Sequence, residues 1–327
     1  HTHTHTPILM DQGHLHPTPA ARLRTLLDDA REASRCEVMP ACHDALSARL
    51  IERAGFRVAF MSGFAVSASG LALPDAGFIS YGEQLSVGQN ICAAIDTRRL
   101  LVIGDGDTGF GGSGNVRRTI EGYAKAGFAG VSIEDQVYPK RCAYSGGVAV
   151  VPREEAVARV RCAIAARDEM RRRSGLDLVL VARTDCRRAE EDLDEVLWRC
   201  RAFAALGADV VYAEGLAPDE LRRLCVSLGP TVHTMLAQVE RPGVTLISQT
   251  EAAALGCRLS LFGLTVLSAA VSAMTRALEA MASGGHPSTG VLCDFGELKA
   301  LVGFDALDAW EEEHQACPAV GQDGAAE

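Results

Sequence analysis

Two aspartates, Asp105 and Asp107, stand one residue apart in the segment GDGDTGFGGSGN, after the apolar run LLVI and before a glycine-rich turn. Neighbouring carboxylates repel each other unless a cation lies among them. Oxygen ligands without histidine or cysteine favour the hard cations Mg²⁺ and Mn²⁺ over zinc. We therefore predict that this pair holds a divalent cation and that the following glycines let a substrate approach.

A second reactive segment is the loop EDQVYPKRCAYSGG, residues 134–147, in which Lys140 and Arg141 precede Cys142. Neighbouring positive charge is expected to lower the pKa of a thiol. Cys142 could then act as a general acid or base, although a lone cysteine beside two cations is more often incidental. Loops bounded by proline and glycine commonly close over a substrate and exclude water.

Eight apolar, β-rich runs alternate with amphipathic segments that have helical spacing. The runs cover residues 36–41, 57–62, 100–105, 130–135, 178–184, 209–214, 231–236 and 258–263. This alternation predicts an α/β fold with a parallel sheet, and eight repeats predict a closed (β/α)8 TIM-type barrel. An open doubly wound sheet is the alternative, but no GxGxxG follows the first run.

In a (β/α)8 barrel the chemistry lies at the carboxyl ends of the strands. Five runs end in polar residues: Ser62 and Gly63, Asp105 and Asp107, Glu134 and Asp135, Arg183 and Asp185, and Glu214. Each alone is better explained as a solvated strand end or a helix cap. Together they predict a metal site. The planar guanidinium of Arg183 could bind a carboxylate or phosphate through two parallel hydrogen bonds. The backbone amides of Ser62 and Gly63 could bind an oxyanion.

The predicted barrel occupies residues 19–283, and the helix that precedes residue 36 is expected to cap its bottom. Residues 1–18 and 316–327 are expected to be disordered tails. The acidic amphipathic extension over residues 284–315 needs a partner for its apolar face, either the same barrel or a neighbouring subunit.

The composition argues against nucleic-acid-binding and membrane proteins. The net charge of −10, without a cluster of Lys and Arg, argues against a nucleic-acid partner. No apolar run approaches the roughly 18 residues of a membrane span, so we expect no membrane partner. Eleven cysteines without CxxC or zinc-like spacing suggest reduced thiols and a cytoplasmic location. An organellar matrix is the alternative if a transit peptide has been removed.

Four motifs resemble those of the isocitrate lyase and phosphoenolpyruvate mutase superfamily, in particular its methylisocitrate lyase and 2,3-dimethylmalate lyase branch. They are SGFAVSASGLALPD, DGDTGFGG, IEDQVYPKRC and VARTD, in this order, and the resemblance runs from about residue 19 to residue 312. It implies a (β/α)8 barrel whose C-terminal helices are exchanged between the subunits of a homodimer or homotetramer.

The resemblance also implies a site. Mg²⁺, or Mn²⁺ in its place, would lie near Asp75, Asp105, Asp107 and Glu134, partly through water. A 2-oxo acid would contact Ser62, Gly63 and Arg183, with Phe64, Glu214 and Met235 as further substrate-binding residues. Lys140, Arg141 and Cys142 match the loop in which the lyases carry the cysteine that protonates the carbon acid, so Cys142, Lys140 and Arg183 would be catalytic, with Tyr144 the next candidate for the acid.

Three departures affect the expected substrate. Ala143-Tyr144 stands where the lyases have glycine-histidine, Thr234-Met235 where the family has alanine-asparagine, and Gly263-Leu264-Thr265 where it has Pro-Leu-Ser. Two of these changes make the distal pocket more apolar, where an unpaired carboxylate binds poorly. A smaller or more hydrophobic 2-hydroxy or 2-oxo acid therefore fits better than a tricarboxylate. His43 is a candidate replacement donor, although a structural role is favoured for both His43 and His233.

The leading hypothesis is an oxo-acid lyase that cleaves a methylisocitrate- or dimethylmalate-like 2-hydroxy dicarboxylate through an enolate, releasing pyruvate or glyoxylate and a second carboxylate. The alternatives are an oxaloacetate-type hydrolase or decarboxylase and a carboxyphosphonoenolpyruvate-type mutase. A non-catalytic protein that binds 2-oxo acids is less favoured, since it would retain a costly acidic cluster without a purpose.

Overall fold

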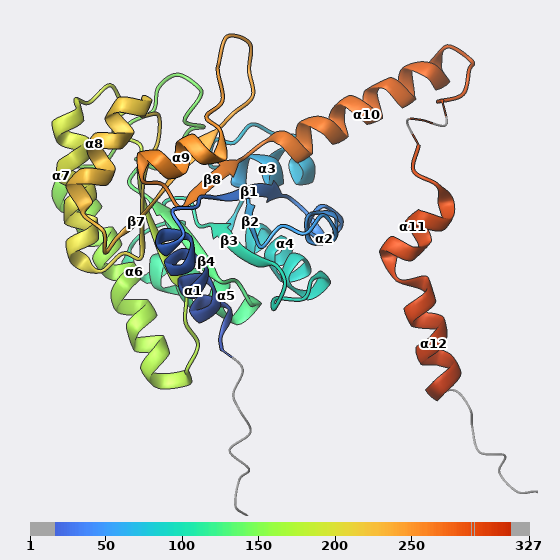
Figure 1. Cartoon of the computed structure of the whole chain (residues 1–327), viewed down its shortest axis with the longest axis horizontal. Coiled ribbons are helices and arrows are strands. Elements are labelled where there is room, and N and C mark those ends of the chain that lie inside the picture. The colour runs from blue at the N-terminus through green and yellow to red at the C-terminus, as the bar shows by residue number, and fades with distance from the viewer. Residues whose placement is uncertain (1–16, 289, 291, 315–327) are drawn as a thin grey trace, which may run out of the picture. The chain divides into compact units, whose positions relative to one another are not determined.

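The strands form a closed parallel barrel in the order β1 to β8, which confirms the predicted (β/α)8 architecture (Figure 1). The computed structural model describes residues 17–288, 290 and 292–314. The strands are β1 Glu37–Cys42, β2 Val58–Met61, β3 Leu101–Asp105, β4 Gly130–Glu134, β5 Val179–Thr184, β6 Val210–Ala213, β7 His233–Gln238 and β8 Leu259–Phe262.

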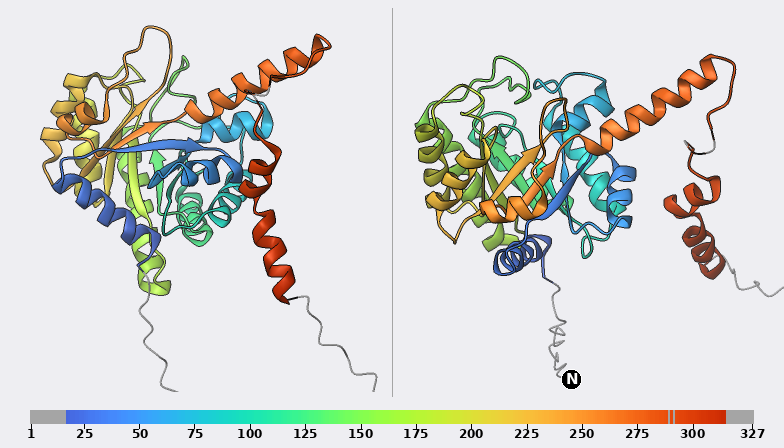
Figure 2. Two further views of the ribbon diagram at one scale, coloured as in Figure 1. Left: turned by 45° about the vertical axis from the view of Figure 1, so that its right-hand side comes forward. Right: turned by 45° about the horizontal axis from the view of Figure 1, so that its top comes forward.

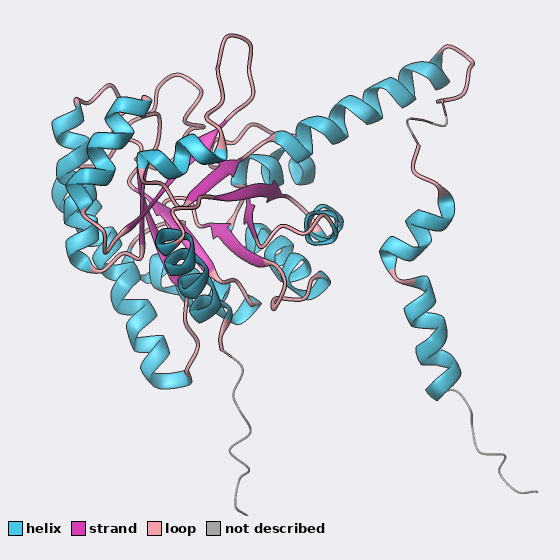
Figure 3. Cartoon of the chain, viewed as in Figure 1, coloured by secondary structure: helices cyan, strands magenta, loops and turns pink. Residues whose placement is uncertain are grey.

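Helices alternate with the strands and cover the outside of the barrel (Figure 3). The helices of the barrel unit are α1 Pro19–Glu32, α2 Ala45–Arg53, α3 Gly63–Leu71, α4 Tyr81–Ala94, α5 Ser113–Ala126, α6 Arg153–Ser174, α7 Leu193–Leu206, α8 Pro218–Leu228 and α9 Gln249–Leu255. The chain continues with α10 Thr265–Ala282, α11 Phe295–Val302 and α12 Phe304–His314. None of the described helices is both long enough and apolar enough to cross a membrane.

Each strand lies within about two residues of a predicted run, because the apolar runs are the segments that the barrel buries. The largest difference is in β7, predicted over residues 231–236 and observed at His233–Gln238. Pairing with β8 explains this shift, since Met235 to Gln238 pair with Leu259 to Phe262 along the whole length of β8.

The inner core lies inside the barrel and continues into α1, as expected for a capping helix. Leu23 and Leu27 of α1 are fully buried in one cluster with strand residues such as Val58 and Val179. Burial of each leucine contributes about 1.5–3 kcal/mol. Arg24, on the same helix, pairs with Asp177 at 2.6 Å and with Asp209 at 2.7 Å. Figure 2 shows α1 in dark blue at one end of the barrel.

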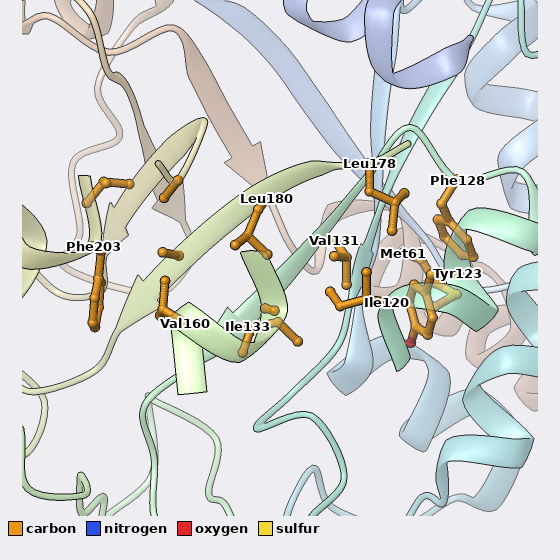
Figure 4. Close-up of a cluster of buried hydrophobic side chains, with 14 of the residues drawn as sticks. Met61, Ile120, Tyr123, Phe128, Val131, Ile133, Val160, Leu178, Leu180 and Phe203 are labelled. Atoms are coloured by element: carbon orange, nitrogen blue, oxygen red, sulfur yellow. The ribbon is translucent and has the colours of Figure 1, made fainter. Parts of the chain in front are cut away.

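The outer core lies between the strands and the surrounding helices, and part of it is shown in Figure 4. Here the rings of Tyr123 and Phe128 stack with centroids 4.7 Å apart. Glycine is required at position 104 of β3, because a Cβ there would lie 2.4 Å from the Tyr123 ring. The Tyr123 hydroxyl donates to the Asp105 carbonyl at 2.7 Å, so this packing positions the end of β3.

The chain divides into two units, one that extends to Leu267 and holds the barrel, and one that begins at Ser268. The division falls inside α10, whereas the sequence placed the end of the barrel at residue 283. In the second unit, apolar side chains of α11 and α12 are exposed, among them Phe295, Phe304 and Trp310. That a neighbouring subunit covers residues 284–315 stays a prediction.

The two predicted tails fall mostly outside the described residues. Residues 1–16 and 315–327 are not described. Thr18, placed in the first tail by the sequence, is the N-cap of α1, and its hydroxyl accepts a hydrogen bond from the amide of Ala21 at 3.2 Å.

Candidate active site

The carboxyl ends of the strands surround a cavity of about 80 Å³. It brings together many residues that the sequence singled out, because the strands of a closed parallel barrel end at one rim. The predicted site residues that line it are Ser62, Phe64, Asp75, Asp105, Cys142, Tyr144, Arg183 and Glu214. Gly63, Asp107, Glu134 and Lys140 contact these lining residues.

A buried ammonium group, that of Lys140, lies between two of the acids of this rim. The Lys140 ammonium lies 2.5 Å from Asp75 Oδ1 and 2.9 Å from Asp107 Oδ1. Burial alone lowers the pKa of Lys140, but the carboxylates of Asp107 and Asp75 raise it well above its usual range. Lys140 is therefore a fixed positive charge, placed where the sequence predicted only a bound metal ion.

The geometry of Asp105 and Asp107 requires glycine on the neighbouring strand end. Asp105 Oδ2 accepts from the Gly63 amide at 3.2 Å, and Oδ1 accepts from the Asp107 amide at 3.3 Å. A Cβ at position 63 would lie 2.9 Å from Asp105 Oδ2. Asp107 itself has a left-handed backbone with φ of 46°, a strained conformation that is common at functional sites.

Protonation of the acids is shifted by burial. Burial raises the pKa of Asp107 to about 7, and Asp105 and Asp75 add to the rise while Lys140 opposes it. Burial likewise raises the pKa of Glu134 well above its usual range, against the influence of Arg183. Near pH 7 and without a bound metal ion, the acidic cluster therefore binds a proton.

Arg183 lies beside these acids at the end of β5. Its Nη2 donates to Asp185 Oδ1 at 2.9 Å, and its Nε lies 3.4 Å from Glu134 Oε2. Although burial lowers the pKa of Arg183, Asp185 and Glu134 raise it well above its usual range. The guanidinium therefore stays charged and can bind an anion in the cavity.

A divalent cation fits the donor atoms of this rim. Glu134 Oε1 is buried and accepts no hydrogen bond from a described residue. Its neighbours Asp75, Asp105 and Asp107 offer carboxylate oxygens, the ligand type that Mg²⁺ and Mn²⁺ prefer. No three described His, Cys, Asp or Glu side chains are close enough to enclose an ion directly. The acids would thus hold it partly through water.

The predicted oxyanion role of two backbone amides does not agree with this geometry. The Ser62 amide donates to the Cys42 carbonyl at 3.2 Å, and the Gly63 amide donates to Asp105. Ser62 is also the N-cap of α3, since its hydroxyl accepts from the Ala65 amide at 3.3 Å. Its hydroxyl and the Phe64 ring, rather than these amides, are what β2 and α3 present to a ligand.

The expected lowering of the thiol pKa at Cys142 is wrong for this conformation. Cys142 lines the cavity, but burial raises its pKa, and the charge of Asp75 adds to the rise while Lys140 opposes it. The lowering by Lys140 is outweighed by burial, and the Lys140 ammonium is itself paired with Asp75 and Asp107. Cys142 is therefore a protonated thiol, able to give up a proton rather than to attack as a thiolate.

Tyr144, also on this loop, points to the opposite wall of the cavity. Its hydroxyl donates to Glu214 Oε1 at 2.9 Å, and the Tyr212 hydroxyl donates to the other oxygen of Glu214. Burial raises the pKa of Tyr144, and Glu214 raises it further. Tyr144 thus forms part of the cavity wall beside Glu214.

Met235 is corrected from a substrate contact to a core residue. It is 1% exposed, belongs to the inner core and pairs with Leu259 at the amino end of β8. The β7 residue that lines the cavity is Ala237, two positions further along the strand. Thr234 faces outward, where its hydroxyl donates to the Gly256 carbonyl at 3.2 Å. The β7 departure therefore does not act on the substrate directly.

Neither of the two singled-out histidines lines the cavity. His233, at the start of β7, lies 3.3 Å from Asp28 of α1. His43, just after β1, is buried, and its Nδ1 has no hydrogen-bond partner among the described residues. The contact of His233 with Asp28 agrees with the satisfied structural role favoured for it, whereas the Nδ1 of His43, unpaired among the described residues, does not.

Some supporting contacts were not predicted, although Asp135 itself was singled out among the polar strand ends; Arg199, Arg188 and Arg241 were not. Asp135 Oδ2 accepts from Thr184 at 2.6 Å and from Arg199 at 3.0 Å, which fixes the ends of β4 and β5 against α7. Arg188 and Arg241 stand over the Tyr144 ring, with guanidinium carbons 4.5 and 5.0 Å from its centroid. Both come from long loops, where side-chain direction does not follow from spacing.

A closed (β/α)8 barrel with an acid- and arginine-lined cavity at the carboxyl ends of its strands defines a barrel enzyme. Residues 27–282 match the family model described as phosphoenolpyruvate phosphomutase. The chain belongs to this family, and it is an enzyme of the isocitrate lyase and phosphoenolpyruvate mutase superfamily. The resemblance inferred from the four motifs is confirmed.

Relatives within this superfamily differ in the reactions for which they are named. The chain is 32% identical to 2,3-dimethylmalate lyase of Eubacterium barkeri over 299 residues, which covers 90% of this chain and 97% of the relative. A structure of oxaloacetate acetylhydrolase with 3,3-difluorooxalacetate has a TM-score of 0.82 and 32% identity, covering 91% and 97% of the two chains. A structure of phosphonopyruvate hydrolase with oxalate and Mg²⁺ has a TM-score of 0.77 and 27% identity, covering 91% and 100%.

Proposed function

We propose that this enzyme is a Mg²⁺-dependent carbon–carbon lyase that cleaves a substituted 2-hydroxy dicarboxylate into a 2-oxo acid and a second carboxylate. The observation that carries the proposal is the position of Cys142, a protonated thiol on the wall of the cavity that also holds Arg183 and Asp105. Cleavage leaves a carbanion that must be protonated, and a buried thiol in this place can supply that proton.

Each residue of the cavity has its own role in the proposed cleavage. Arg183 binds the carboxylate beside the 2-hydroxyl carbon, and the Ser62 hydroxyl and the Phe64 ring border the same end of the cavity. As the 2-hydroxyl gives its proton to the Asp105 carboxylate, which lines the cavity, that carbon becomes a carbonyl and the bond to the neighbouring carbon breaks. The electron pair moves onto the leaving carbon and its carboxylate as an enolate. The Cys142 thiol then gives its proton to this carbon.

Asp75, Asp105, Asp107 and Glu134 would hold the divalent cation, which when bound supplies positive charge for the oxygens of the forming 2-oxo acid. Lys140 keeps the acids neutralised and positions the loop that carries Cys142. Glu214, held by the Tyr144 and Tyr212 hydroxyls, forms the wall opposite the acids. A second copy of this chain is proposed to cover the apolar faces of α11 and α12, as a homodimer or homotetramer.

A second candidate function is hydrolysis of an oxaloacetate-like acid. The likeness to oxaloacetate acetylhydrolase favours it, because that structure matches this chain with a TM-score of 0.82. Hydrolysis of oxaloacetate gives oxalate and acetate, so its products differ from those of the lyase.

The deciding experiment measures release of pyruvate or glyoxylate from a panel of alkyl-substituted malates, with Mg²⁺ and with excess EDTA. We expect Mg²⁺-dependent release from at least one of them. Formation of oxalate and acetate from oxaloacetate, without release from any malate, would assign the hydrolase instead. Rearrangement of phosphonopyruvate, followed by phosphorus NMR, would assign a mutase.

Affinity for Mg²⁺ is expected to rise with pH through about 7. Burial raises the pKa of Asp107 to about 7, so below that pH the folded protein binds a proton that a cation must displace. The affinity should fall up to about tenfold for each unit of pH below 7, as for one competing proton. Calorimetric titration of the protein with Mg²⁺ at pH 6, 7 and 8 checks this, and a flat profile would contradict the role of Asp107.

A further inference from the structure

A second cavity, of about 310 Å³, lies on the far side of Tyr144. It shares Tyr144, Glu214, Ala237 and Val239 with the catalytic cavity of about 80 Å³. The two spaces are therefore adjacent, and the Tyr144 side chain, hydrogen-bonded to Glu214, stands at the wall between them. No role in the proposed reaction uses the larger space.

The charge of this second cavity comes mainly from Arg188 and Arg241. Arg188 lies in the loop between β5 and α7, and Arg241 in the loop between β7 and α9, so two separate loops bring them to the same ring. Glu214 is the sole acid in the lining, set against these two arginines. The cavity thus carries an excess of positive charge in a protein of net charge −10.

Among the described residues, neither guanidinium has acceptors for all of its N–H donors. Arg188 Nη2 is 3.5 Å from Glu214 Oε1, an oxygen that already accepts from Tyr144, and Arg188 Nε is buried without an acceptor. The Arg241 guanidinium has no carboxylate within ion-pair distance among the described residues. A buried donor without an acceptor is costly, and a carboxylate matches the guanidinium fork.

The rest of the lining is apolar and includes Leu216, Leu236 and Ile247. A short hydrocarbon chain with a carboxylate at its end is complementary to such walls and to the two arginines. The two arginines add a charged contribution to a distal pocket that the departures were expected to make more apolar.

We propose that this cavity is a second anion subsite, in which Arg188 and Arg241 bind a carboxylate at the far end of the substrate. The inference rests on the proposed function, since it places the 2-oxo or 2-hydroxy acid end of the same molecule at Arg183. The carboxylate of the leaving half is accordingly placed past Tyr144, which disfavours a substrate that has an alkyl group at that end.

The test uses two ligands of equal chain length, 2-oxoglutarate and 2-oxopentanoate, which differ in having a carboxylate or a methyl group at the far end. Binding of each to the full chain with Mg²⁺ is measured by calorimetry. The wild type should bind 2-oxoglutarate at least about tenfold more tightly, as for one charge-assisted contact. Equal affinities would overturn the proposal.

Variants then locate the subsite. Arg188→Met and Arg241→Met should each reduce the preference for 2-oxoglutarate to less than about threefold, while binding of oxalate stays unchanged. Arg187→Met is the matched control, because Arg187 pairs with Glu220 at 3.0 Å and does not line the cavity. Loss of preference in the control alone, or retention in both other variants, would place the far carboxylate elsewhere.

Failure of the subsite and failure of the proposed function give different results. Oxalate has no far end, so normal oxalate binding with equal affinity for the two longer ligands overturns only the subsite. Absence of Mg²⁺-dependent cleavage with an intact preference for 2-oxoglutarate overturns only the lyase.

Arg241 is exposed, so the Arg241→Met variant still tests the subsite if Arg188→Met fails to fold.

Discussion

Asp107→Ala is expected to abolish Mg²⁺-dependent turnover, with a loss of at least about 10²–10³-fold. A bound cation contributes several kcal/mol of charge stabilisation, and each 1.36 kcal/mol is about tenfold in rate. Asp107 is 4% exposed, and its Oδ1 is 2.9 Å from Lys140 Nζ, so the substitution removes a central carboxylate of the cluster. Initial rates over a range of Mg²⁺ concentrations, together with titration of Mg²⁺ binding, measure the effect.

The isosteric variant Asp107→Asn separates loss of charge from loss of packing, and we expect it to lose turnover while unfolding at nearly the wild-type temperature. Asp219→Ala is a suitable control, since Asp219 is an exposed acid in the first turn of α8. Unchanged rates and Mg²⁺ affinity in Asp107→Ala would show that the cation binds somewhere else.

Cys142→Ser should lower the rate of cleavage by roughly 10²-fold or more while binding of Mg²⁺ and oxalate stays intact. This is the size of effect expected when a positioned general acid is removed, because a serine hydroxyl is a much weaker acid than a thiol. The serine keeps nearly the size of the side chain, so the conformation of the loop around position 142 should persist. Single-turnover rates with a cleaved malate, beside oxalate titrations, provide the measurement.

Cys162→Ser is the matched control, since Cys162 lies on α6 and its thiol donates to the Ser113 carbonyl, away from the cavity. A Cys142→Ser enzyme with near-normal turnover would transfer the acid role to another group. Tyr144 is then the next candidate, because its hydroxyl is held in the same cavity by Glu214.

The barrel could be predicted because its signals are local. Each strand is a short apolar run followed by an amphipathic helix, and the strand order follows from the alternation itself. The gathering of Asp105, Glu134 and Arg183 also followed, since residues at the carboxyl ends of parallel strands meet at one rim. These predictions required only the alternation of apolar runs with amphipathic segments and the closure of the sheet into a barrel.

The details of the site depended on side-chain directions that spacing does not encode. Met235 was expected at the substrate because the resemblance places it where the family has asparagine, but β7 extends two residues beyond the predicted run and places Ala237 at the cavity instead. Lys140 was read as a charge acting on the adjacent thiol, whereas its side chain turns to Asp75 and Asp107. Arg188 and Arg241 are 53 positions apart, and only the folded loops bring both to Tyr144.

The cap formed by α1 sets a limit on how far the protein can be trimmed. Leu23 and Leu27 complete the inner core, and Arg24 neutralises Asp177 and Asp209 at the amino ends of β5 and β6. A shortened version that starts at β1 would expose that core to water and remove the closest cation of Asp177, while Asp209 would keep only its pair with Arg167 at 2.8 Å. A working minimal enzyme must therefore keep the chain from Thr18 onward, and an affinity tag or a fused partner is best joined ahead of that residue, at the opposite end of the barrel from the chemistry.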